Sequence, residues 1–325
     1  MKLKSLKSLK RFTRFNLIDF AVPILDHMCP LKYSPNRKYS NRYYLTCLLH
    51  FVETSVSWRK YQGSPEFPIN GKCLNYIHNK YIKAGAYAEI EKQLINKYLK
   101  TDREHKLKYQ IIDSSFIANK GCSVNNNNHF LSFDEKNKNK VIRKLNKKLP
   151  KNKKIRERTF VDFNRYNGRK KYVNVSIICD SYGVPLARDI FSSKRKDSTT
   201  VIEMVNKLPI NINTLKNSKI NRYKQTFLGD CGYCSKRNRL FLDKKGYRTL
   251  IKFNKRNTKN KKLIKSMKFT KEQKQTFKRR GMVENFFSWI KNKPVINQNY
   301  QKTISSYNGL LSLSCIILIS SRIGF

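Results

Sequence analysis

Phe277-Lys-Arg-Arg-Gly-Met-Val-Glu-Asn-Phe-Phe-Ser-Trp-Ile-Lys291 is the stretch that says most about this chain. At about 100° per residue, Arg280, Glu284 and Lys291 fall within about 40° of one line along a helix. A carboxylate between two cations is suited to holding a divalent metal ion while the cations bind phosphate oxygens. Such phosphodiester chemistry needs further carboxylates from elsewhere in the fold. The sequence offers two well-placed candidates, Asp113 and Asp230.

The charge of the chain points to a polyanionic partner. Among its 325 residues, 70 Lys and Arg stand against 21 Asp and Glu, a formal net charge of +49. An AT-rich genome would raise Lys, Asn and Ile in the same way, but it does not account for the scarcity of acids. The hydrophobic content of 39% is enough for a sizeable core.

Residues 1–40 are basic and interrupted by Pro23, Pro30 and Pro35. Proline inside a helix removes a hydrogen bond, so this part is predicted to be an extended, basic N-terminal arm rather than one long helix. The first ten residues carry a Lys at every second or third position, which does not fit a secretory signal. The eight cysteines are therefore expected to be reduced intracellular thiols.

Three helices are predicted for residues 41–105. The first covers Tyr43 to Ser57 and the third runs from Ala86 to about Leu99. The second begins after Asn70, a good N-cap, and ends at Gly85. Three short helices in a basic context suggest a DNA-binding domain, and a bundle that only supports the rest of the protein is the alternative.

The remainder alternates strands and helices. A strand leads into Asp113, a hairpin covers residues 168–191, and a strand from Tyr223 ends at Gly229-Asp230. Asp197 or Ser198 is predicted to cap the helix after the hairpin. Another helix starts at Ser235, and a strand at residues 248–253 precedes the quoted helix. Between the first strand and the hairpin lies a basic, Asn- and Lys-rich insertion at about 121–165, which is expected to be mobile.

This order resembles the RNase H-like fold, an α/β mixed sheet flanked by helices, here with a small N-terminal all-α domain. The spacing of Phe277, Arg280, Glu284 and Lys291 resembles the Tyr-Arg-Glu-Lys signature of insertion-sequence DDE transposases, and only Phe277 departs from it. Further stretches are similar to motifs of the same family: Ser57-Trp-Arg59, Ile112-Asp-Ser-Ser115, Gly183-Val-Pro-Leu186, Lys196-Asp-Ser198 and Gly229-Asp-Cys-Gly-Tyr233. The resemblance covers most of residues 41–325.

The resemblance implies that residues 106–325 form an RNase H-like DDE catalytic domain. Asp113, Asp230 and Glu284 would be its catalytic triad, binding two Mg²⁺ or Mn²⁺ ions. Arg280 and Lys291 would position phosphates. The protein would then be a DNA transposase that cleaves the ends of a mobile element and transfers the strands. Its partner would be double-stranded DNA, both element ends and target, and it would act as a homodimer on that DNA.

Arg169, Lys170 and Lys171, beside a predicted strand, are further candidates for DNA contact. Three other acids, Asp180, Asp189 and Asp197, stand where turns and caps are expected and are excluded from the triad. A non-catalytic DNA-binding protein derived from a transposase, or a general RNase H-like nuclease, are the competing interpretations. The apolar segment 310–320 is shorter than a membrane span and is predicted to be a buried terminal helix. The expected location is intracellular and DNA-associated, with no membrane partner.

Overall fold

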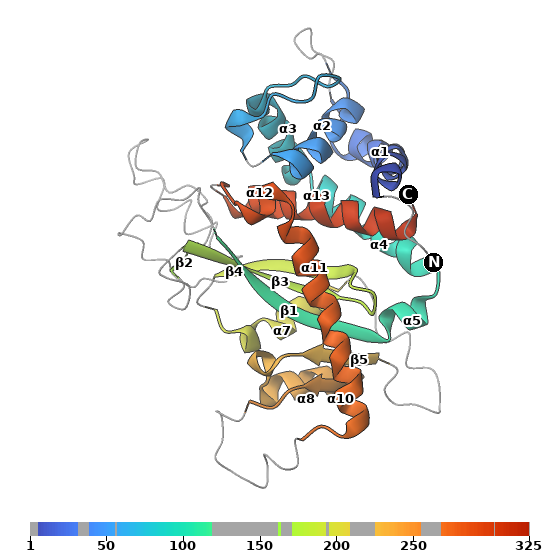
Figure 1. Cartoon of the computed structure of the whole chain (residues 1–325), viewed down its shortest axis with the longest axis vertical. Coiled ribbons are helices and arrows are strands. Elements are labelled where there is room, and N and C mark those ends of the chain that lie inside the picture. Colours follow the sequence, from blue (N-terminus) through green and yellow to red (C-terminus); the bar gives the residue numbers. More distant parts are fainter. Residues whose placement is uncertain are drawn as a thin grey trace.

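A mixed β-sheet forms the centre of the protein, and helices pack around it (Figure 1). The computed structural model describes residues 6–31, 39–55, 57–118, 162–163, 171–192, 195–208, 225–254, 268–301 and 303–324. The strands are β1 (Tyr109–Ala118), β2 (Asp162–Phe163), β3 (Lys171–Cys179), β4 (Pro185–Ser192), β5 (Gln225–Gly229) and β6 (Tyr247–Ile251).

The topology of the sheet is that of the predicted α/β fold. β3 pairs with β1 on one side and with β4 on the other, antiparallel in both cases. β5 then adds to β1, and β6 adds to β5, both in parallel. The short β2 pairs with the start of β3. The mixed sheet flanked by helices, with helices at the N-terminal end, is thus confirmed.

The C-terminal half contributes helices between and after the strands. Their bounds are η4 (Asp197–Thr199), α7 (Val201–Asn206), η6 (Cys231–Tyr233), α8 (Lys236–Lys244), α10 (Lys271–Phe277), η8 (Lys278–Arg280), α11 (Gly281–Lys291), α12 (Pro294–Asn297) and α13 (Ile304–Ile323). Ser235 caps α8 as predicted, since its side chain accepts from the backbone N–H of Asn238. Figure 1 shows α10 and α11 running as one rod across the sheet.

Helices make up the N-terminal part of the chain. They are α1 (Leu6–Met28), α2 (Asn41–Thr54), η1 (Trp58–Lys60), α3 (Gly71–Lys83), α4 (Ala86–Lys100) and α5 (Arg103–Leu107). Asn70 caps α3 by accepting from the backbone N–H of Lys72. The predicted stripe of α3, formed by Leu74, Ile77 and Tyr81, is buried. The prediction of α3 is confirmed because its N-cap, its apolar stripe and the glycine that follows it lie within one short stretch.

The prediction of an extended arm over residues 1–40 is wrong for residues 6–28, which form α1. Pro23 lies inside this helix, at a cost of about 3 kcal/mol. That cost is offset because Leu17, Ile18, Ala21 and Leu25 are buried, each large apolar side chain contributing about 1.5–3 kcal/mol. Their stripe packs on α2, α4 and α13. The helix still ends two residues before Pro30, as a proline stop requires.

α13 lies between the N-terminal helices and the sheet (Figure 1). Among the described residues it is the helix that could cross a membrane by length and composition, and 72% of its most apolar window is buried inside the protein. It packs on all four of α1 to α4 and on β4. The predicted buried terminal helix is confirmed, and it joins the helical part to the sheet in one core.

His78 of α3 is fully buried against α13 and α4. Its Nε2 lies 3.0 Å from the carbonyl oxygen of Ser306, and its Nδ1 lies 3.0 Å from the hydroxyl of Tyr87. A carbonyl can only accept, so Nε2 carries the proton and the Tyr87 hydroxyl donates to Nδ1. Burial lowers the pKa of His78 from 6.5 to about 4.

We expect His78 to make the protein less stable as the pH falls from 6.5 towards 4. Over this range the unfolded chain protonates the imidazole while the folded protein does not, which lowers the free energy of unfolding by up to about 3 kcal/mol. His78→Gln should remove this contribution. Urea unfolding of the original protein and of His78→Gln at pH 7 and pH 5 measures this contribution, because every other titrating group is the same in the two proteins. The same pH dependence in the two proteins would contradict the assignment.

Candidate active site

The pairing of β1 with β5 brings the first two predicted acids together. Ile111 stands opposite Leu228 in this parallel pair. Asp113 and Asp230 each follow two residues further along, and they are close enough for the charge of Asp230 to act on Asp113. The Asp113 carboxylate accepts from the backbone N–H of Ser114 at 2.9 Å. Asp230 caps η6 by accepting from the backbone N–H of Cys231 at 2.7 Å.

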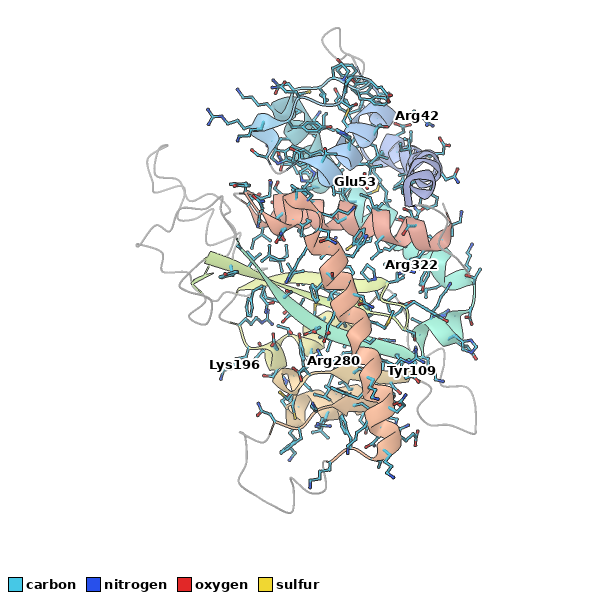
Figure 2. The ribbon with its side chains drawn as sticks, in the orientation of Figure 1. Arg42, Glu53, Tyr109, Lys196, Arg280 and Arg322 are labelled. Atoms are coloured by element: carbon cyan, nitrogen blue, oxygen red, sulfur yellow. The ribbon has the colours of Figure 1, made fainter. Side chains whose placement is uncertain are left out.

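The third acid comes from α11, which packs on β1 and β3. Val283, Phe286, Phe287 and Ile290 form its buried face. Arg280, at the start of the helix, lies against the sheet (Figure 2) and joins two of the acids. Its Nη1 is 3.0 Å from Oδ2 of Asp113, and its Nη2 is 2.8 Å from Oε1 of Glu284. Arg280 and Glu284 therefore share one side of the helix, as their spacing predicted.

The turn between β3 and β4 fixes where α11 begins. Gly183 has a φ of +77°, and a Cβ atom there would lie 3.1 Å from the carbonyl oxygen of Met282. A larger residue would be strained in this backbone conformation and would press on the helix. By contrast, a Cβ atom at Gly281 would meet no atom within 4 Å.

These two glycines should respond in opposite directions to replacement by alanine. Gly281 already has helical dihedrals, so Gly281→Ala should stabilise the protein by about 0.4–1 kcal/mol and raise the melting temperature by about 1–3 °C. Gly183→Ala should lower it, because a left-handed conformation costs a non-glycine residue about 1–2 kcal/mol. Calorimetry of both variants measures the signs. A stabilising Gly183→Ala would show that this turn does not constrain α11.

Burial and neighbouring charges act on Asp113 in the same direction. Its side chain is 19% exposed. Burial raises the pKa of Asp113 to about 6, and the negative charges of Asp230 and Asp197 add to this. The Ser114 N–H and the Arg280 guanidinium oppose the increase without cancelling it. The ionised carboxylate is thus incompletely compensated, and an additional cation would stabilise it.

A family model described as "Transposase DDE domain" matches residues 105–319, about two-thirds of the chain. The chain belongs to this family. The matched part of the transposase begins in α5, just before β1, and ends within α13, so it includes all three predicted acids. The predicted resemblance is confirmed.

No curated protein matches this transposase sequence. A crystal structure of a pre-cleavage Mos1 transpososome is a structural match with 12% sequence identity, covering 100% of this chain and 89% of that one. The TM-score is 0.24, so the two chains do not superpose as wholes.

The acids of the transposase fit a divalent cation by chemistry, since carboxylate oxygens are the ligands that Mg²⁺ and Mn²⁺ prefer. They do not form one ligand shell. Among the described residues, no three His, Cys, Asp or Glu side chains are close enough together to hold a metal ion. The Glu284 side chain is 60% exposed and hydrogen-bonds to Arg280. Exposed side chains change rotamer within nanoseconds, so the contact with Arg280 does not hold Glu284 in one rotamer.

The other predicted contact residues lie further from the acids or outside the described structure. Lys291 is the last residue of α11, two turns beyond Glu284, and is half-buried. Arg169 and Lys170 lie outside the described residues, and Lys171 starts β3 without a described side chain. The predicted insertion at 121–165 also lies outside them, apart from β2. Phe277, which replaces the family's Tyr, packs against Phe269 with ring centroids 5.3 Å apart.

Of the three acids excluded as turn or cap residues, Asp180 behaves as expected. It accepts from the backbone N–H groups of Tyr182 and Val184 in the hairpin turn. The expected place of Asp189 is wrong, because Asp189 lies inside β4, where it pairs with Lys207. The prediction that Asp197 or Ser198 caps the next helix is wrong. Lys196 is the N-cap of η4 and Thr200 that of α7, and neither helix has a side-chain cap. The Asp197 side chain instead accepts a hydrogen bond from Ser114 of β1, which lies 83 positions earlier in the chain. The sequence feature that could have singled out Asp197 was its place in Lys196-Asp-Ser198, which is similar to a motif of the family.

Proposed function

We propose that this transposase cleaves phosphodiester bonds at the ends of a mobile element and transfers the freed strands to target DNA. Asp113, Asp230 and Glu284 are its proposed catalytic residues. The supporting observation is that β1, the end of β5 and the start of α11 converge, with Arg280 bound to Asp113 and Glu284. Three segments that are far apart in sequence thus each contribute one of these acids, and Arg280 joins two of them.

In this proposal Asp113 and Asp230 hold two Mg²⁺ or Mn²⁺ ions, and Glu284 completes the ligand set after leaving Arg280. When bound, two such ions activate the attacking oxygen and stabilise the leaving oxygen of an in-line displacement. The acids themselves bind and orient. Arg280, once released from the carboxylates, is placed to bind a phosphate oxygen of the strand being cut, and Lys291 is placed to bind one further along that strand.

Double-stranded DNA, both element end and target, is the proposed partner, with the protein acting as a homodimer. The net charge of +49 supports a polyanion. Exposed Lys side chains on α3 and α4 support it further: Lys72, Lys83, Lys92, Lys97 and Lys100. Each phosphate neutralised adds about −0.9 to the slope of log affinity against log salt concentration. Binding should therefore weaken steeply between low and physiological salt.

The test is a strand-transfer assay with the full-length protein and duplexes that carry the inverted repeats flanking its gene. Cleavage at the repeat ends and joining to a target duplex are expected with Mg²⁺ or Mn²⁺ and not with EDTA. Scrambled repeats serve as the matched control. Equal cutting of scrambled DNA would favour a general RNase H-like nuclease.

A DNA-binding protein derived from a transposase remains the second candidate, favoured by Phe277 in the place of the family's Tyr. It predicts salt-sensitive binding to the repeats with no cleavage under either metal ion. That result would overturn the proposed activity while leaving the family assignment intact.

A further inference from the structure

Asp197 lies in the short turn η4 between β4 and α7, and its side chain reaches the strand that carries Asp113. Oδ1 of Asp197 accepts a hydrogen bond of 3.0 Å from the hydroxyl of Ser114. Ser114 follows Asp113 directly in β1. A shift of the Asp197 carboxylate would therefore act on Ser114, the residue next to Asp113.

The other oxygen of the same carboxylate lies close to the turn that carries the second acid. A Cβ atom at Gly232 would lie 3.1 Å from Oδ2 of Asp197. Gly232 belongs to η6, the turn that Asp230 caps. Because glycine has no side chain, this turn can approach Asp197 closely. One carboxylate thus contacts the segments of both Asp113 and Asp230.

Asn238 of α8 connects the same two turns a second time. Its side chain is buried, and Nδ2 donates to the carbonyl of Ser198 at 2.7 Å and to that of Tyr233 at 2.9 Å. Ser198 follows Asp197, and Tyr233 ends η6. The turn of Asp197 and the turn of Asp230 are therefore held together by an amide as well as by close packing.

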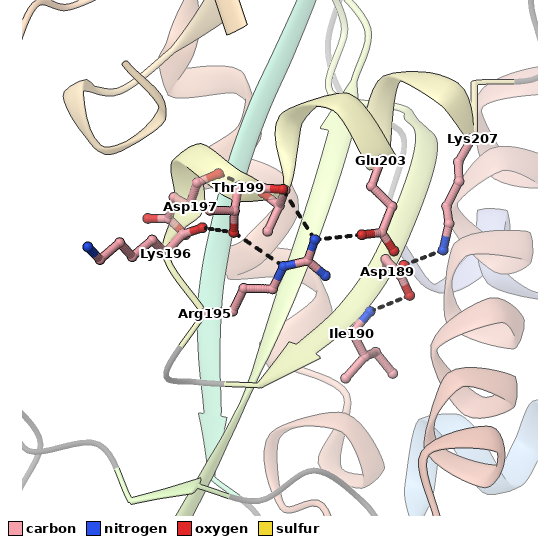
Figure 3. A network of polar contacts seen from close by, with 9 residues as sticks. Asp189, Ile190, Arg195, Lys196, Asp197, Thr199, Glu203 and Lys207 are labelled. Carbon is pink, nitrogen blue, oxygen red and sulfur yellow. Dashed lines mark hydrogen bonds and ion pairs between the residues drawn. The ribbon is translucent and has the colours of Figure 1, made fainter. Parts of the chain in front are cut away.

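Further hydrogen bonds and an ion pair hold the turn of Asp197 (Figure 3). Arg195 donates to the carbonyl of Thr199 at 3.2 Å and to the carboxylate of Glu203 at 2.7 Å. The hydroxyl of Thr200 donates to the carbonyl of Asp197 at 2.8 Å. The backbone that presents Asp197 is thus fixed by contacts that do not involve its carboxylate.

We propose that Asp197 is a positioning residue, which fixes the spacing between Asp113 and Asp230 that divalent cations require. This assignment rests on the proposed function. Groups that orient ligands are as important as the ligands, and their loss weakens metal binding about 10–100-fold. A functional constellation tolerates displacements of only about 0.5 Å, and Asp197 joins the two segments whose separation must be held to that tolerance.

The first measurement is Mn²⁺ binding by the full-length protein without DNA, followed by the EPR signal of free Mn²⁺. Asp197→Ala should weaken binding about 10-fold or more. Asp197→Asn should weaken it less than about 3-fold, because the amide oxygen still accepts from Ser114. Glu272→Gln is the matched control, since Glu272 lies on α10, pairs with Arg248 and has a side chain that is 78% exposed. Thermal unfolding checks that each variant is folded.

Cleavage at element ends provides a second readout. Activity of Asp197→Ala should return as Mn²⁺ is raised, because the ligands remain and only their spacing has relaxed. Gly232→Ala tests the proposal without changing Asp197, since the added Cβ would press on its carboxylate. It should weaken Mn²⁺ binding about 3–10-fold, less than removal of the carboxylate does.

The possible outcomes separate this assignment from the proposed function. If the unsubstituted protein shows no saturable Mn²⁺ binding, the proposed metal site fails and Asp197 loses its role with it. If that protein binds Mn²⁺ and Asp197→Ala binds it equally well, only the positioning role is overturned. Asp197→Asn as weak as Asp197→Ala would also overturn it, because a direct ligand charge would then be the explanation.

Discussion

Asp113→Asn, Asp230→Asn and Glu284→Gln should each lower cleavage and strand transfer by at least about 10³-fold while leaving DNA binding intact. A bound metal ion supplies several kcal/mol of transition-state stabilisation, and about 1.4 kcal/mol corresponds to a factor of ten in rate. An amide has nearly the shape of the carboxylate and carries no charge, so the fold is kept while the metal ligand is weakened. Cleavage rates and filter-binding affinities at one salt concentration measure the two effects separately.

Glu272→Gln is the matched control for this series. Glu272 lies on α10, in the same helical rod as Glu284, and its side chain is 78% exposed with Arg248 3.7 Å away. Exposed ion pairs of this kind contribute about 0–1 kcal/mol, so activity should be unchanged. Cleavage by Glu284→Gln at the rate of Glu272→Gln would remove Glu284 from the triad.

Asp113→Asn should also leave the metal-free protein at least as stable as the original. The environment of Asp113 disfavours its ionised form, since burial and two nearby carboxylates raise its pKa to about 6. Removing the charge takes away this penalty at neutral pH, although the contact with Arg280 is weakened. Loss of activity without loss of melting temperature is the pattern of a residue kept for function rather than for folding.

The elements that sequence could predict are those whose signals are local. The second and third N-terminal helices, the hairpin and the strand ending at Asp230 each carry their cap, stripe or turn within a short stretch. The order of these elements resembled the RNase H-like fold, and that resemblance implied that Asp113 and Asp230 belong to one site. No long-range information was needed for either step.

The misses share a different cause, which is dependence on distant residues. α1 tolerates Pro23 because its buried stripe packs on α13, at the other end of the chain. Asp197 has the sequence context of a helix cap. In the folded protein its side chain accepts a hydrogen bond from Ser114 instead. Likewise, the sequence did not predict the contact of Arg280 with Asp113, which spans 167 positions.

Arg280 occupies the position between two proposed metal ligands, and this has consequences for metal binding. Its guanidinium donates to Asp113 and Glu284 at 3.0 and 2.8 Å and is 23% exposed. A cation already compensates part of the acidic charge, and it lowers the pKa of Asp113. A divalent ion that binds Oδ2 of Asp113 or Oε1 of Glu284 would therefore compete with Arg280 for that oxygen.

Arg280→Gln should accordingly change three quantities in different directions. Mn²⁺ binding to the DNA-free protein should tighten about 3–10-fold, or about 0.7–1.4 kcal/mol, because the ion pairs that the metal ion must displace lie in a partly exposed site and contribute about 1 kcal/mol. The metal-free protein should become less stable, since Asp113 loses its partner. Cleavage should fall about 10²-fold, because a charge-assisted contact with the phosphate, worth about 3 kcal/mol, is lost.

Lys291→Gln separates the competition from the loss of a phosphate contact. Lys291 is on the same helix, two turns beyond Glu284, so its removal should slow cleavage without altering Mn²⁺ affinity. EPR titration of Mn²⁺ into the two variants distinguishes them directly. Tighter Mn²⁺ binding in Arg280→Gln alone means that Arg280 holds the acids until metal and DNA displace it. Unchanged binding in both variants would mean that metal ions enter without displacing the arginine, and the ligand set would then have to form without the Oδ2 atom of Asp113 that Arg280 holds.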